Sequence, residues 1–141
     1  MKYKLIGLYE LITGVFGVLL LMFNIGKAFN DTSILFTFIL GILLYAGVAY
    51  AGYALINNFK NGVKFSILAQ AFQMVSFIAG GIQYLFTASA FISLVYEKNL
   101  NMKTQLAPIA YNISKVSEYI PFEITFYVVP IVLAVLLIIK D

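Results

Sequence analysis

The sequence predicts an all-α membrane protein, with four transmembrane helices in an up-down bundle and a short extracytoplasmic amphipathic helix. Hydrophobic residues make up 62% of the 141-residue chain and charged residues 11%, whereas soluble domains are about half apolar and about a quarter charged. Four apolar segments fill most of the length, and about 20 residues suffice to cross a bilayer as a helix. Residues 1–141 are therefore expected to form a single four-span membrane domain.

The first two spans are predicted at about residues 5–24 and 34–56. Two lysines precede the first span, as they would in a secretory signal. However, the apolar run is longer than an ordinary signal core, it contains Glu10, and no convincing small-residue cleavage site follows, so a retained helix is favoured. The second span ends at the polar, glycine-containing segment 57–62, which predicts a turn.

The third span is predicted at residues 65–87, with an extension to 95, and the fourth at 122–139. The third apolar run is too long for one crossing, so it should tilt, bend near Gly80–Gly81, or protrude from the bilayer. The fourth span contains Pro130, which lacks a backbone donor and clashes with the preceding turn. A local kink is therefore expected in the fourth span.

The one substantial loop, residues 97–121, carries an amphipathic pattern in its second half. Apolar residues recur there at three- and four-residue spacing, with polar residues between them, and Pro108 stands where a first-turn proline is tolerated. The pattern predicts a short surface helix at about residues 108–119. A cover over the outer ends of the spans is the preferred interpretation, and a partner-binding element is the alternative.

Lysines on the two sides of the predicted spans indicate the orientation. Five lie on the side of the N-terminus (Lys2, Lys4, Lys60, Lys64 and Lys140) and four on the other (Lys27, Lys98, Lys103 and Lys115). The first group is closer to the span ends, where positive charge determines orientation. Both termini are therefore predicted to be cytoplasmic. The all-lysine basic content and frequent Ile, Asn and Phe suggest an AT-rich bacterial genome, so the protein is expected in the inner membrane of a bacterium.

Several classes of function are excluded by residues that the chain lacks. It has no histidine and no cysteine, so the usual zinc, haem and Ser-His constellations cannot be formed. Its lysines are dispersed at segment ends, whereas nucleic-acid binding would require a clustered basic face. We expect no catalytic residues, no metal, no cofactor and no nucleic-acid partner.

Glu10 is the most informative polar residue, because a carboxylate within an apolar span is costly and usually faces a partner inside the bundle. Gln70 and Gln73 lie at a matching depth in the third span, so a hydrogen bond from one of these amides to Glu10 is predicted. The three residues form a predicted intramembrane polar site. The contact is interpreted either as packing between helices or as a protonatable site on a transport path.

Small residues on three of the predicted spans indicate close helix packing. The predicted packing positions are Gly7, Gly14, Gly17, Gly47, Gly52, Ser76 and Gly80. Such residues let helix backbones approach closely in membranes. A single chain of four helices has few interior faces for so many small residues, which favours contacts with further helices.

The sequence thus favours a non-enzymatic membrane protein that acts as an oligomer or as an accessory subunit of a membrane complex. Its expected partners are the lipid bilayer and other copies or other membrane subunits. A small transporter or channel-forming protein with a Glu/Gln site is the alternative. An intramembrane enzyme is the least favoured, because Glu10 lacks a second catalytic group. No motif identifies a family.

Overall fold

The computed structural model consists of two compact units, Met1–Ala69 and Gln70–Asp141, and each is described by itself. The residues that it describes are 1–27, 32–79, 82–88, 91–96, 100–105, 110–115 and 123–139. The described residues are mostly helical, with four α-helices and one antiparallel sheet.

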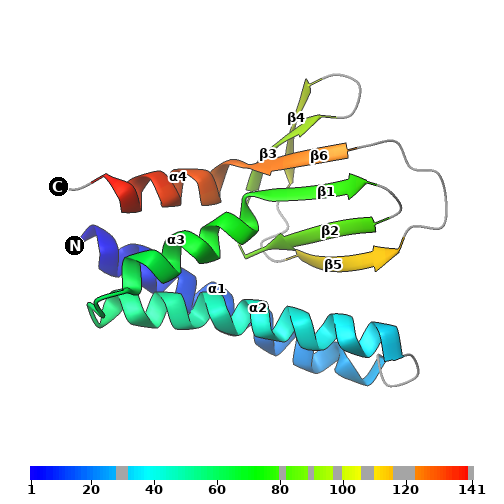
Figure 1. The fold of residues 1–141 in the computed structure, drawn as a ribbon, viewed down its shortest axis with the longest axis horizontal. Helices are drawn as coiled ribbons and strands as arrows, with labels where there is room; N and C mark the ends of the chain where they lie inside the picture. The colour runs from blue at the N-terminus through cyan, green and yellow to red at the C-terminus, as the bar shows by residue number, and fades with distance from the viewer. Residues whose placement is uncertain are drawn as a thin grey trace. The chain divides into compact units, whose positions relative to one another are not determined.

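The first unit is built on a hairpin of two long helices. Helix α1 covers Lys2–Asn24 and continues as a short 3₁₀ turn, η1, at Ile25–Lys27, and α2 covers Thr32–Ile56. The two helices run antiparallel beside each other (Figure 1). Neither contains proline, and long uninterrupted apolar sequence allows each backbone to satisfy its hydrogen bonds within its own helix.

A tight turn ends α2 and begins α3, which covers Gly62–Gln73. The amide of Phe59 donates to the Ala54 carbonyl at 2.9 Å and the amide of Asn58 donates to the Leu55 carbonyl at 3.2 Å. Asn58 has a φ of 54°, so the two bonds form a Schellman cap with asparagine in the left-handed position. The turn predicted at residues 57–62 is confirmed.

The hairpin turns small residues inward and large apolar residues outward. The buried residues of α1 are Ile6, Gly7, Glu10, Gly14 and Gly17. Its exposed large apolar residues are Leu5, Leu8, Ile12, Val15, Phe16, Leu19, Leu20, Met22 and Phe23. By length and composition, Lys2–Asn24 and Leu35–Ile56 can each cross a membrane; core helices of soluble proteins and signal sequences meet the same criteria.

The second unit contains a six-stranded antiparallel sheet. Its strands are β1 Val75–Ala79, β2 Ile82–Thr87, β3 Phe91–Tyr96, β4 Leu100–Gln105, β5 Ala110–Lys115 and β6 Glu123–Tyr127. They are arranged in the order β4-β3-β6-β1-β2-β5. In the register of β1 and β2, Phe77 stands opposite Tyr84 and Ala79 opposite Ile82. Helix α4, Val128–Ile138, follows β6 directly (Figure 1).

The helical part of the predicted fold class is observed, but the all-α four-span bundle is not confirmed. The run expected to be one helix over residues 65–95 is helical to Gln73 and then forms β1, β2 and β3. Valine, isoleucine, phenylalanine and tyrosine are frequent in these strands, and such residues favour extended structure. Gly80 and Gly81, which connect β1 and β2, lie outside the described residues.

Two further predictions differ from the structure. The segment 108–119 was expected to form a surface helix, but it contains strand β5, which pairs with β2 over its whole length. The kink expected at Pro130 is absent from the described helix, because α4 begins at Val128. Pro130 thus lies in the first turn, where a missing N–H removes no intrahelical hydrogen bond.

Candidate functional site

The candidate site is centred on Glu10, whose side chain is 0% exposed. Gly7, Glu10, Gly14 and Gly17 follow one another at helical spacing on the inner face of α1. The only residue with a long side chain on this stripe is Glu10. The small neighbours therefore allow the next helix to approach closely at Glu10.

Gly52 of α2 provides the surface against which Glu10 lies. A Cβ atom added at Gly52 would be 2.9 Å from the Glu10 Cβ, and one added at Gly7 would be 2.8 Å from the Gly52 carbonyl oxygen. Both distances are shorter than ordinary carbon contacts of about 3.5–4.0 Å. Glycine is therefore required on both sides of this helix crossing.

Ser66 of α3 completes the site, because its hydroxyl donates a hydrogen bond to the Glu10 Oε1 atom. Ser66 is also 0% exposed. The start of α3 is held near α2 by Gly62, where an added Cβ would be 2.8 Å from the Ala54 carbonyl oxygen. Glu10, Gly52 and Ser66 thus join three helices within the first unit.

The arrangement offers a carboxylate and a hydroxyl shielded from solvent. A carboxylate in a membrane interior is retained where it has polar partners, and a hydroxyl donor supplies one. The same carboxylate is also able to take up a proton or hold a cation. Among the described residues, no group of three acidic, histidine or cysteine side chains could hold a metal ion.

Thr13, one turn beyond Glu10, does not contribute its hydroxyl to the site. Its Oγ1 donates to the Tyr9 carbonyl at 2.9 Å and lies 3.3 Å from the Glu10 carbonyl. Such backbone bonding is usual for threonine within a helix. The hydroxyl that serves the site comes from α3 instead.

Gln70 and Gln73 are both buried and occupy the last turn of α3. The Gln73 Oε1 accepts a hydrogen bond of 2.9 Å from the Ala88 amide. Both glutamines belong to the second unit, whose position relative to the first is not determined, so their predicted bond to Glu10 stays a prediction. Sequence analysis did not identify Ser66 as the partner of Glu10.

The predicted packing positions have different surroundings. Gly7, Gly14, Gly17 and Gly52 all lie where the two helices of the hairpin approach closely, whereas a Cβ added at Gly47 would meet nothing within 4 Å. Ser76 lies on β1, and its hydroxyl is 3.2 Å from the Tyr127 hydroxyl. Gly80 lies outside the described residues.

Among the titratable groups of the sheet, Tyr111 has the most informative environment. Burial, with a smaller contribution from the neighbouring Tyr84, raises the pKa of Tyr111 to about 12. Its ring meets the Phe86 ring edge to face at a centroid distance of 6.3 Å. The pKa is therefore a probe of the pairing between β5 and β2.

Neither a family model, nor a curated protein, nor a solved structure matches this chain.

Proposed function

We propose that the chain is an integral membrane protein that inserts through the α1–α2 hairpin. The observation that supports this most strongly is the inverted arrangement of the hairpin, with Gly7, Glu10 and Gly14 inside and large apolar residues outside. Soluble monomers rarely expose an apolar patch larger than a few hundred Å². In membranes, small residues at helix contacts and apolar residues facing lipid are the usual arrangement.

Extraction of membranes at alkaline pH tests this proposal. The full chain is expected to stay in the membrane pellet, and the mature protein is expected to retain Lys2 when its N-terminus is sequenced. Release into the supernatant would contradict insertion. Loss of the first apolar segment would show that α1 serves as a signal sequence instead.

We propose that the protein is multi-pass, with four spans in the bilayer. The Ser66–Glu10 bond holds the first turns of α3 against the hairpin, so α3 runs back along α2 toward the bilayer interior. Its 12 residues rise only about 18 Å, less than the hydrocarbon thickness of about 30 Å. An open sheet would leave unpaired backbone groups in lipid, so a third crossing at this place requires the residues that form β1 in the structure to become helical in the bilayer.

A cysteine at Ser114 distinguishes four spans from two, because the native chain has no cysteine. In the four-span arrangement residues 97–121 are extracytoplasmic, and Ser114→Cys should react with an impermeant thiol reagent from outside. If only α1 and α2 cross, the sheet stays on the side of the N-terminus. Labelling of Ser114→Cys from the cytoplasmic side alone would therefore contradict the four-span proposal.

We place both termini in the cytoplasm, with the protein in the inner membrane of a bacterium. Lys2 and Lys4 lie in the first turn of α1, and Lys60 and Lys64 lie on either side of the start of α3 at the same end of the hairpin. Only Lys27 follows α1 at the other end. Lysines near span ends remain on the cytoplasmic side, so this asymmetry supports the orientation.

The proposed role is that of a non-enzymatic oligomer or accessory subunit. Most of the exposed large residues of the hairpin are apolar, and such a surface suits lipid or further transmembrane helices. Purification in mild detergent with mass measurement tests the role. A particle of several copies, or one with a second membrane protein, is expected, and a strict monomer without partners would contradict it.

A second candidate function, a small transporter or channel, is supported by the buried carboxylate itself. Glu10 and Ser66 are both 0% exposed yet polar. If Glu10 carries a proton or cation, Glu10→Gln should abolish flux from proteoliposomes while assembly persists, because only the titratable charge is lost. Unchanged flux, or no flux in the native protein, would exclude transport.

A further inference from the structure

We propose that one end of the helical unit binds the headgroups of anionic phospholipids. This basic end consists of Lys2, Lys4, Lys60 and Lys64 together with the aromatic residues Tyr53 and Phe59. The proposal rests on the proposed membrane insertion, because only an inserted hairpin would hold these side chains at the height of the headgroups.

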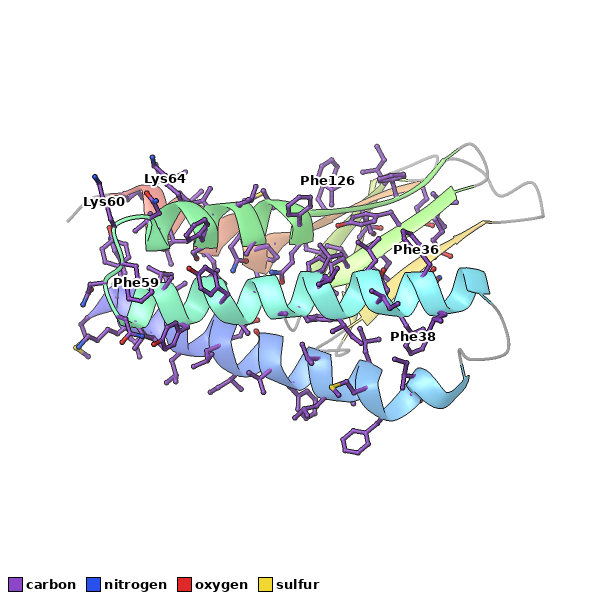
Figure 2. All side chains as sticks on the ribbon, turned by 60° about the horizontal axis from the view of Figure 1, so that its bottom comes forward. Phe36, Phe38, Phe59, Lys60, Lys64 and Phe126 are labelled. Carbon is purple, nitrogen blue, oxygen red and sulfur yellow. The ribbon has the colours of Figure 1, made fainter. Side chains whose placement is uncertain are left out.

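Three helices bring the lysines to the same end. The close contact of Gly7 with Gly52, Leu55 and Ile56 places the start of α1 beside the end of α2. The turn after α2 then carries Lys60, and Lys64 lies in the first turn of α3. Figure 2 shows Phe59, Lys60 and Lys64 together at this end of the unit, and Phe36 toward the other end of α2.

Three of the four lysines at the basic end are accessible to a ligand. Lys4, Lys60 and Lys64 are exposed, and residues 1–9 and 57–65 contain no aspartate or glutamate. Lys2 lies over the Tyr3 ring at 5.1 Å, a distance suited to a cation–π contact. The basic end therefore carries positive charge that no acid in these two segments balances.

Aromatic side chains mark the height of the bilayer boundary at the same place. Tyr53 and Phe59 are about half exposed and meet edge to face at a centroid distance of 5.7 Å. Tyr50 and Phe65 form a second pair at 5.6 Å. Exposed aromatic rings of membrane proteins concentrate at the headgroup level, so the neighbouring lysines reach the lipid phosphates.

The partner chemistry is that of a phosphate within a lipid of net negative charge, such as phosphatidylglycerol. A zwitterionic lipid carries the same phosphate next to a cation, which lowers its attraction to lysine. Each lysine close to an anionic membrane surface adds to the attraction between protein and lipid. This attraction decays over a Debye length, which shortens as salt is added. A preference for anionic lipid that weakens with added salt is therefore expected.

The test measures the relative affinity of the reconstituted full chain for spin-labelled phosphatidylglycerol and phosphatidylcholine by electron paramagnetic resonance. The native protein should prefer phosphatidylglycerol. In the double variant Lys60→Gln/Lys64→Gln, the affinity for phosphatidylglycerol relative to phosphatidylcholine should fall by up to about fivefold for each lysine removed. The double variant Lys60→Arg/Lys64→Arg should retain the native preference. The double variant Lys103→Gln/Lys115→Gln removes the same charge from the sheet and should behave as the native protein does.

Three results would overturn the proposal. One is equal affinity of the native protein for the two lipids, and another is an equal loss in the two glutamine variants. The third is abolition of the preference by inorganic phosphate at matched ionic strength, which would indicate a site for soluble phosphate. Failure of the native protein to float with vesicles would instead contradict the proposed insertion itself.

Discussion

A methyl group at Gly14 would have to enter the backbone of α2. The added Cβ of a Gly14→Ala variant would lie 2.8 Å from both the Ala49 Cα and the Tyr45 carbonyl oxygen. Carbon atoms pack at about 3.5–4.0 Å, so the helices would have to separate by about 1 Å at this crossing. Neither obstructing atom belongs to a flexible side chain, which means that a whole helix must move.

Gly47→Ala is the matched control, because its added Cβ meets nothing within 4 Å. Both substitutions gain the same helix propensity, at most about 1 kcal/mol relative to glycine. The difference between the two variants therefore isolates the helix contact. Overpacking of this kind costs about 1–3 kcal/mol, so Gly14→Ala should be less stable than Gly47→Ala by that amount.

Titration of sodium dodecyl sulfate into mixed micelles, followed by circular dichroism, measures the free energy of unfolding of each variant. Gly14→Ala is expected to lose its structure at a lower sodium dodecyl sulfate content than Gly47→Ala. Equal transitions in the two variants would refute the reasoning, because they would show that α1 and α2 do not approach closely at Gly14.

Three further predictions use the cap, the polar site and the sheet. Asn58 has a φ of 54°, so Asn58→Val should lower the free energy of unfolding by about 1–2 kcal/mol, whereas Asn58→Gly should not lower it in the same titration. Glu10→Leu should lower it by about 1–2 kcal/mol, and Ser66→Ala should add little in the Glu10→Leu background; full additivity would contradict the Glu10–Ser66 bond. Because burial raises the pKa of Tyr111 to about 12, its contribution to stability is complete below about pH 10, the ordinary tyrosine value, and is lost as the pH rises through about 12. A titration of tyrosinate absorbance in the native protein and a Tyr111→Phe variant checks this, and an ordinary pKa would contradict the pairing of β5 with β2.

The sequence allowed the hairpin and the central residue of the site to be predicted, because both depend on local patterns. Each of the first two apolar runs is long enough to cross a bilayer as a helix, and the asparagine- and glycine-containing segment 57–62 ends the second run. The small residues around Glu10 recur at helical spacing, which identifies one face. The partner Ser66 was not predicted, because equal distance from Lys4 and Lys64 was assumed to mean equal depth in the two helices.

The sheet was not predicted, because short apolar runs fit a buried helix and a buried strand equally well. The small or polar residues from Ser66 to Thr87 also occur at three- and four-residue steps, a spacing typical of one long helix. The Gly80–Gly81 pair is also typical of a two-residue hairpin turn, and it was interpreted as a bend. Strand β5 shares this ambiguity, since pairing with β2 depends on residues distant in the sequence.

The central claim, that lipid covers the outward face of the hairpin, is tested most directly by the reactivity of single cysteines in cell membranes. Ile12 is 59% exposed and lies on the outward face of α1, while Asn61 lies in the turn between α2 and α3. An impermeant thiol reagent should label Asn61→Cys from the cytoplasmic side and should leave Ile12→Cys unlabelled from either side until detergent denatures the protein. Ready labelling of Ile12→Cys in intact membranes would show that water covers this face, and it would contradict the account.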